Sequence, residues 1–222
     1  MKRGPGRTSS MWHWAIFSSG GAACFRARWF AWAAVLAVLV HFPAYSVVVQ
    51  SQEEALQEAF PEAFVERRTV FLDDRQAEQV RQLGGTKLSS RVVTYYQGIR
   101  DGEVLGTAYF DTHRVRTLPE VLMIVVGTDS TVRRVAVLSF LEPRDYLPGE
   151  RWFEQFHGRS LGEGLSLKRE IRGITGATLS SRAATQAVRR VLALHQVLTE
   201  ALDAAEEVEQ PPAGPSAGDH EQ

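Results

Sequence analysis

The sequence predicts an α+β domain in which helices pack against an antiparallel, twisted β-sheet. Two patterns in the 222-residue chain support this prediction. The first is a series of β-rich segments between Arg91 and Leu141, which are joined by short turns and are therefore expected to pair as antiparallel neighbours. The second is a long pattern after residue 181, in which apolar residues recur every three or four positions. A helix with this spacing presents one apolar stripe and would cover a face of the sheet.

The first 46 residues have the composition of a targeting segment. They contain five basic residues, no acid, and the uncharged apolar run Trp29–Val40, which is as long as the apolar region of a signal peptide. Pro43 and the small-x-small sequence Ala44-Tyr45-Ser46 follow, so we predict cleavage near Ser46. The alternative is an uncleaved membrane anchor of about 20 residues that extends through Val49. Because the basic residues precede the apolar run, both alternatives place the rest of the chain outside the cytoplasm, either secreted into the periplasm or anchored in the inner membrane.

Two helical patterns come next, and residues 47–89 are predicted to form a helical N-terminal extension. Gln52–Phe60 has apolar residues at helical spacing and stops at a proline. Leu72–Leu83 has two aspartates near its start and Gly84-Gly85 after its end, which are typical signals for the two ends of a helix. We interpret the pair as a small packing subdomain, with a docking surface for a partner as the alternative.

Residues 90–203 are predicted to form the main domain. Four segments combine β-branched and aromatic residues with turn residues at their ends: Arg91–Ile99, Val104–Phe110, Glu120–Val126 and Val132–Leu141. The stretch 142–158, EPRDYLPGERWFEQFHG, is expected to be an ordered connection with aromatic anchors at Tyr146, Trp152, Phe153 and Phe156.

The C-terminal part of the chain is predicted to be a helix followed by a tail. The apolar stripe of the helix comprises Ala184, Val188, Val191, Leu192, His195, Leu198 and Leu202. Residues 204–222 turn acidic and then become rich in proline and glycine. Such a composition cannot bury a core, so the tail is expected to be disordered.

Charge and cysteine content argue against several functions. Beyond residue 46 there are 20 basic and 26 acidic residues, a charge of −6, which argues against a nucleic-acid partner. The one cysteine, Cys24, lies in the targeting segment, so the body has no disulfide, thiolate nucleophile or cysteine metal ligand. Neither a Gly-x-Ser-x-Gly nor a His-Glu-x-x-His motif is present, and we predict no catalytic residue and no metal site. His113 and His157 are expected to be isolated surface residues, and His195 a packed residue of the helix stripe.

The stretch Arg172–Ser181, RGITGATLSS, is the strongest candidate for a binding site. Ser180 or Ser181 is expected to cap the following helix, which would place Thr178 just ahead of free backbone N–H groups and the positive end of the helix dipole. A phosphate attached to or resting on Thr178 would be stabilised there, and Gly176 would let a bulky group approach the backbone. The residues alone leave a second interpretation open, in which this stretch is only a Ser/Thr-rich helix cap.

The sequence TGATLSS at 175–181 resembles the Ser/Thr-Gly-Ala-Thr flavinylation motif of FMN-binding domains. This family includes covalently flavinylated components of the sodium-pumping NADH:quinone reductase and of the Rnf electron-transport complex. The stretch 141–159 is also similar to the segment that precedes the motif in the family. Its recognisable positions are Glu142, Pro143, Trp152, Phe156 and Gly158. The resemblance covers about residues 90–200.

The resemblance implies that FMN is the cofactor and that a flavin transferase joins its phosphate to the hydroxyl of Thr178. Cofactor-binding roles are also implied for five neighbours. Gly176 and Ala177 would let the cofactor approach closely, and Thr175 and Leu179 would line the attachment site. Ser180 would cap the helix or contact the phosphate. The family usually carries an acid three residues before the position of Thr175, and this chain has Arg172 there. Noncovalent FMN and the absence of flavin are therefore kept as alternatives.

These observations predict an extracytoplasmic FMN-binding electron-transfer protein. A self-contained enzyme is not favoured, because a flavin reductase would need a nicotinamide site and the chain has no dinucleotide fingerprint. The expected partners are the flavin transferase and membrane or periplasmic electron-transfer proteins. The alternative from another class is a noncatalytic envelope binding or scaffold module with the same fold and no functional flavin.

Overall fold

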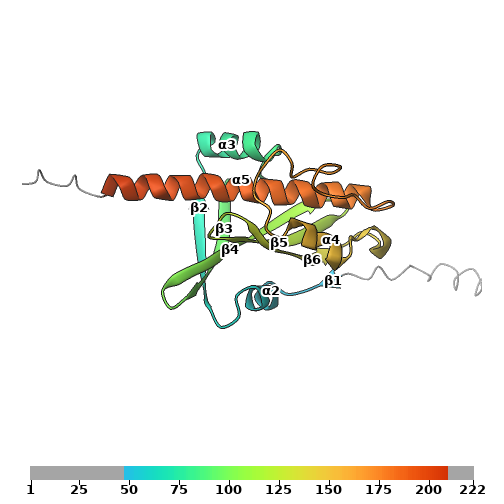
Figure 1. The fold of residues 1–222 in the computed structure, drawn as a ribbon, viewed down its shortest axis with the longest axis horizontal. Coiled ribbons are helices and arrows are strands. Elements are labelled where there is room, and N and C mark those ends of the chain that lie inside the picture. Colours follow the sequence, from blue (N-terminus) through green and yellow to red (C-terminus); the bar gives the residue numbers. More distant parts are fainter. Residues whose placement is uncertain (1–47, 210–222) are drawn as a thin grey trace, which may run out of the picture. The chain divides into compact units, whose positions relative to one another are not determined.

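The computed structural model describes residues 48–209 (Figure 1). The expected targeting segment 1–46 and the part of the expected tail beyond Glu209 lie outside these residues. Among the described residues, no helix is both long and apolar enough to cross a membrane. The described chain contains a six-stranded, fully antiparallel sheet with helices on both faces, so the α+β prediction is confirmed.

The strand order in the sheet is β1-β6-β5-β4-β3-β2. The strands are β1 (Val48–Val49), β2 (Phe64–Phe71), β3 (Val92–Arg100), β4 (Glu103–Arg114), β5 (Pro119–Gly127) and β6 (Val132–Phe140). The four strands that the sequence predicted correspond to β3 through β6. The turn from β3 to β4 has Asp101 and Gly102 at φ values of 55° and 84°. Two consecutive positive φ values are typical of a type I′ turn, which joins adjacent antiparallel strands without splaying them.

Residues 47–89 contain the two expected helices, α2 (Gln52–Ala59) and α3 (Asp74–Gly84), and also two strands that the sequence analysis did not predict. β2 is an edge strand that pairs with β3 along its whole length. It carries adjacent charged residues, and the phenylalanines at its two ends, Phe64 and Phe71, stay 70% and 69% exposed. β2 therefore lacks the apolar alternation that marks a half-buried strand.

The position of β1 bears on the predicted membrane anchor that extends through Val49. Val48 and Val49 pair with Phe140 and Ser139 of β6. Residues that are hydrogen-bonded into this sheet cannot also lie in a bilayer, so the version of the anchor that extends through Val49 is wrong in its last residues. Cleavage near Ser46 would leave β1 intact.

The helices divide between the two faces of the sheet (Figure 1). α2 packs against one face, where Leu56 and Phe60 belong to one apolar cluster with Met123 and Leu138. α3 and α5 (Thr178–Glu209) lie on the other face, over a larger core. The acidic N-cap signal of α3 is confirmed, because the Asp73 side chain accepts the N–H of Gln76 and Gly85 ends the helix with φ 78°.

α5 confirms the predicted long helix and most of its stripe. Ala184, Val188, Val191, Leu192 and Leu198 are buried, whereas Leu202 is 53% exposed. The helix continues to Glu209, so the first residues of the expected disordered tail are helical instead. Five of the six residues at 204–209 are alanines or glutamates, which have high helix propensity.

The connection from β6 to the motif is ordered, as expected. It contains the short helices η1 (Arg144–Tyr146), α4 (Glu150–Phe153) and η2 (Glu154–Phe156). Trp152 makes edge-to-face contacts with Phe153 and Phe156, and all three are buried. Tyr146 is only half-buried, with the Arg116 guanidinium 4.7 Å from its ring centre.

Candidate functional site

The motif lies at the N-terminus of α5. Thr178 is the first residue of the helix, so the helix begins earlier than predicted. Ser180 and Ser181 consequently lie inside its first turn, and the expectation that one of them caps the helix is wrong. Ser181 instead bonds back to Ala177, whose carbonyl accepts both its N–H at 2.9 Å and its hydroxyl at 3.0 Å.

A tight turn precedes the helix. The N–H of Ala177 donates to the carbonyl of Ile174 at 3.2 Å, and Gly176 has φ +89°. A positive φ at the third residue of such a turn is the feature for which a type II turn requires glycine. A Cβ at Gly176 would meet nothing within 4 Å. The backbone conformation therefore requires glycine here, and the space above it is open for a ligand to approach.

The hydroxyl of Thr178 is accessible at this helix end. Its side chain is exposed, and Oγ1 donates to the carbonyl of Ile174 at 3.2 Å. The backbone N–H groups of Thr178, Leu179 and Ser180 have no acceptor among residues 48–209. Unpaired N–H groups are inherent to the first turn of a helix, and together with the helix dipole they favour an anion such as phosphate.

A groove of about 760 Å³ runs beside Thr178. It lies between α5, the loop 166–176 and the C-terminal end of α3 with the two residues after it, Gly84 to Thr86. Of the six predicted site residues, Thr175, Gly176 and Thr178 line this groove. The other three do not line it: Ala177 is buried beneath the turn, Leu179 is 46% exposed, and Ser180 is buried with an Oγ that has no partner among the described residues.

Three basic residues line the same groove. Arg182 lies one helical turn after Thr178, and its side chain is exposed and makes no hydrogen bond or ion pair with another described residue. Arg189 lies further along α5 and is fixed in place, because it donates to the carbonyl oxygens of Gly162 at 2.6 Å, Leu165 at 3.1 Å and Leu83 at 3.4 Å. Lys168 comes from the loop on the opposite side and is exposed.

The site residues predicted from the sequence did not include Arg182, Lys168, Arg189 or the end of α3. The spacing of 178, 182 and 189 along one helix could have indicated a shared face. The contributions from α3 and the loop could not be inferred locally, because they depend on tertiary packing between segments far apart in the chain.

The segment that leads into the motif is held by its backbone. The indole Nε1 of Trp152 donates to the carbonyl of Arg172 at 2.6 Å, and the N–H of Arg172 donates to Oε1 of Gln155 at 2.9 Å. The Arg172 side chain is exposed and borders a second groove of about 460 Å³, which shares no lining residue with the first. The position where the family usually has an acid therefore presents a positive charge to solvent.

A buried charge network connects the sheet to the far end of the first groove. Arg190 of α5 donates to both carboxylate oxygens of Asp111, at 2.8 and 2.6 Å, and to the hydroxyl of Thr86 at 2.9 Å. His113 lies between Asp111 and Glu120, with 2.9 Å from each ring nitrogen to a carboxylate oxygen. Because Thr86 lines the groove, this network helps fix the groove wall.

The expectation that His113 is an isolated surface residue is therefore wrong. Strand alternation places Asp111 and His113 on the same face of β4, and the register puts His113 opposite Glu120. Burial alone would lower the pKa of His113, but hydrogen bonds to Asp111 and Glu120 outweigh it and raise the pKa to about 9. His195 is a packed residue as predicted: its Nδ1 lies 3.0 Å from the Tyr109 hydroxyl, and burial lowers its pKa.

An exposed hydroxyl, unpaired helix N–H groups and cations beside a groove are features that suit a phosphate-bearing ligand. Residues 119–193 match the family model described as the FMN-binding domain. This range runs from β5 through the motif and into α5. Over these residues the chain is similar to FMN-binding domains, and this similarity supports FMN as its cofactor.

The other comparisons are more distant. No curated protein matches the chain. Among solved structures, NqrC from Shewanella oneidensis is similar, with 13% sequence identity and a TM-score of 0.44. The similar region covers 67% of this chain and 90% of that chain.

The groove beside Thr178 fits FMN. Its volume of about 760 Å³ lies in the range of pockets that enclose a cofactor. The helix N-terminus and Arg182 suit the phosphate, and Leu167 and Ile174 offer apolar surface to the ring. FMN would bring its own redox chemistry, and the protein would supply binding and orientation.

Proposed function

We propose that this protein is an extracytoplasmic electron-transfer protein whose FMN is attached covalently, through its phosphate, to Thr178. The observation that carries the proposal is the position of the Thr178 hydroxyl, which is exposed at the first residue of α5 and lines a groove large enough for FMN. Thr175 also lines the groove, but it lies before the turn and is not at the helix start.

The attachment requires little from the chain itself. Thr178 Oγ1 forms a bond to phosphorus, its proton is lost, and the group that activated the phosphate leaves; a flavin transferase would supply this activation. The hydroxyl gives up its 3.2 Å hydrogen bond to Ile174. The phosphodiester keeps one negative charge, which the N–H groups of the first turn and Arg182 would stabilise. Ala177 and Ser180 would support the attachment point from below, and Leu179 would shield it from solvent.

Several features support a location outside the cytoplasm. The basic and apolar pattern of residues 1–46 is that of a signal peptide or anchor. β1 begins at Val48, directly after the expected cleavage site at Ser46, so no part of the sheet would be lost. Covalent attachment would also keep FMN from diffusing away in a compartment where free FMN is not retained. We propose residues 90–203 as the FMN-binding domain, 47–89 as an extension that completes its sheet, and 204–222 as a C-terminal tail.

The proposed electron donor and acceptor are membrane or periplasmic electron-transfer proteins. A reduced flavin can pass electrons across a short distance when its ring edge is accessible, and this requires no catalytic acid or base. The chain has no dinucleotide fingerprint that would let it draw electrons from a nicotinamide.

Co-expression with a flavin transferase tests the proposal. The purified chain should be yellow, should bleach with dithionite, and should gain the mass of one FMN less one water in denaturing mass spectrometry. A yellow protein whose colour separates from the chain on denaturation would leave FMN binding intact and overturn the covalent bond.

A second candidate is a noncatalytic envelope module with the same fold. The observation that favours it is the positive side chain of Arg172 at the position where the family usually has an acid. A colourless chain of unchanged mass, after co-expression with an active transferase, would support this candidate instead.

A further inference from the structure

Positive charge is concentrated around the motif. The two grooves that flank the segment leading into α5 are lined by six basic residues and one acid: Arg151, Arg159, Lys168, Arg172, Arg182 and Arg189, with Glu170. The whole chain, in contrast, has 25 basic and 26 acidic residues. This concentration is therefore local and does not follow from composition.

Two of the six basic residues are already engaged. Arg159 lies 3.4 Å from Glu170, and Arg189 is bound to three carbonyl oxygens. The other four side chains are exposed and make no hydrogen bond or ion pair with any residue in 48–209. We refer to these four as the cationic rim: Arg151, Lys168, Arg172 and Arg182.

Nearby acids do not neutralise the rim. Glu150 and Glu154 flank Arg151 in sequence, but they line a different groove, together with residues of β6. α4 therefore separates its charges, with Arg151 beside the motif and the acids on another side. On the loop before the motif, Glu163 lines neither of the two grooves.

The rim has more charge than FMN requires. A phosphodiester on Thr178 carries one negative charge, and Arg182 is the rim residue nearest to it in the helix. Arg151 and Arg172 line only the second groove, which has no lining residue in common with the groove beside Thr178. Uncompensated charges of one sign around a groove raise the local concentration of oppositely charged partners and their association rate.

We propose that the cationic rim is the docking face for an acidic surface of a redox partner protein. This inference rests on the proposed function, because it assumes that electrons enter or leave beside the motif. Charge complementarity identifies the partner as acidic. A protein partner is favoured over an anionic membrane for two reasons. The rim borders two grooves, which a protein surface can fill. Binding to a membrane surface needs an apolar face that enters the bilayer, and Leu179 is the one large exposed apolar side chain on the motif segment. The rim also gives the positive charge of Arg172 a role.

The first test uses the full-length chain carrying FMN. After reduction, its flavin gives two electrons, one to each of two ferricyanide ions, and the second-order rate is measured against ionic strength. Ferricyanide is strongly anionic, so the rate should fall about tenfold from low to high salt. Hexaammineruthenium(III), which is cationic, should show the opposite trend. A ferricyanide rate that does not change with salt would overturn the proposal.

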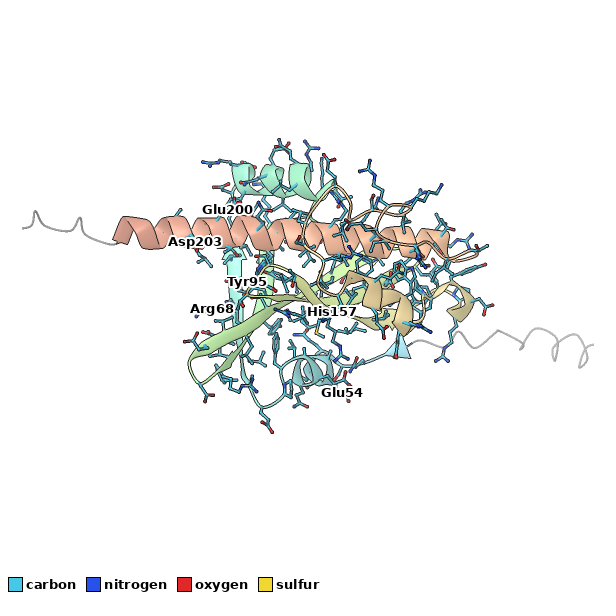
Figure 2. The ribbon with its side chains drawn as sticks, viewed as in Figure 1. Glu54, Arg68, Tyr95, His157, Glu200 and Asp203 are labelled. Atoms are coloured by element: carbon cyan, nitrogen blue, oxygen red, sulfur yellow. The ribbon has the colours of Figure 1, made fainter. Side chains whose placement is uncertain are left out.

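Matched variants distinguish the effect of charge at the rim from the effect of the protein's net charge. Arg151→Glu combined with Arg172→Glu should abolish or invert the salt dependence. The control variant, Arg67→Glu combined with Arg100→Glu, makes the same change in charge on β2 and β3. These strands lie at one end of the sheet, whereas α4, which carries Arg151, packs against β6 near the other end. Figure 2 shows this separation, with Arg68 on β2 and His157 beside α4. Equal effects of the two double variants would contradict a localised docking face.

The second test does not need flavin, so it tests the docking face independently of the proposed function. A fluorescent decaglutamate peptide should bind the full-length chain at low salt, as measured by anisotropy. The rim double variant should lose at least tenfold in affinity, and the control double variant should bind like wild type. Tighter, rim-dependent binding to phosphatidylglycerol vesicles than to the peptide would instead identify an anionic membrane. If the chain carries no flavin but binds the peptide through the rim, the proposed function is contradicted and the docking face is supported.

Discussion

At the scale of single residues, Thr178 differs from the other hydroxyl residues of the motif in its surroundings. It is exposed and begins α5, whereas Ser180 and Ser181 are buried in the first turn. We therefore expect Thr178→Ala to abolish the FMN adduct that wild type acquires with the transferase. Thr175→Ala is the matched control and should still be modified, because Thr175 lines the groove without occupying the helix start. Denaturing mass spectrometry of the three proteins measures this, and a modified Thr178→Ala chain would contradict the assignment.

Arg182 allows a test of phosphate binding that does not depend on the covalent bond. In a Thr178→Ala background, FMN can bind only noncovalently, and its fluorescence should be quenched on binding. Adding Arg182→Gln should weaken the affinity about tenfold, which corresponds to the loss of a charge-assisted hydrogen bond of roughly 1.5 kcal/mol. Arg67→Gln, far along the sheet on β2, should leave the affinity unchanged. Equal dissociation constants for the Arg182 and Arg67 variants would exclude this role for Arg182.

At the scale of elements, the turn before α5 depends on Gly176. Its φ of +89° costs any other residue about 1–2 kcal/mol, although a Cβ there would meet nothing within 4 Å. Gly176→Ala should lower the free energy of unfolding by that amount and reduce the yield of FMN adduct. Gly173→Ala is a matched control in the same segment, since Gly173 has the same open space and no positive φ. Urea unfolding of both variants compares them, and equal losses would show that the turn is not the cause.

The elements also show what local sequence could predict. β3 to β6 were predicted because β-branched and aromatic residues are concentrated between turn residues, and α5 because its apolar stripe is long. β2 was not predicted because it is an edge strand with adjacent charges, which pairs with β3 along its whole length and packs only Val65 and Val70 against the apolar clusters.

At the scale of the whole molecule, the charge network joins α5 to β4 and β5 and should make stability depend on pH. The folded protein keeps the proton of His113 up to about pH 9, against 6.5 for an unperturbed histidine. The stabilising contribution is therefore complete below pH 6.5, declines as the pH rises to about 9, and is absent above that. The loss should be at most about 3 kcal/mol.

Urea unfolding across this pH range measures the effect. His113→Gln removes the titrating group, so the slope between pH 6.5 and 9 should flatten, even though the variant is less stable overall because Glu120 loses its partner. A wild-type slope that survives in His113→Gln would assign the pH dependence to other groups.

The site was only partly predictable from sequence. The motif led to Thr175, Gly176 and Thr178, which line the groove, because a short stretch defines both the turn and the helix start. Lys168 and the end of α3 could not be found, because they reach the groove only through tertiary packing of segments that are far apart in the chain. The buried position of His113 depended on the register of β4 with β5, which a single strand does not reveal.

The most direct test of covalent attachment at Thr178 is the location of the flavin in the chain. Trypsin should release residues 173–182 as one peptide, because Arg172 and Arg182 flank the motif and no basic residue lies between them. After co-expression with a flavin transferase, this peptide should carry the mass of one FMN less one water, and its fragment ions should place the addition on Thr178. An addition on Thr175 or a serine, or an unmodified peptide as the only form, would contradict the proposed attachment.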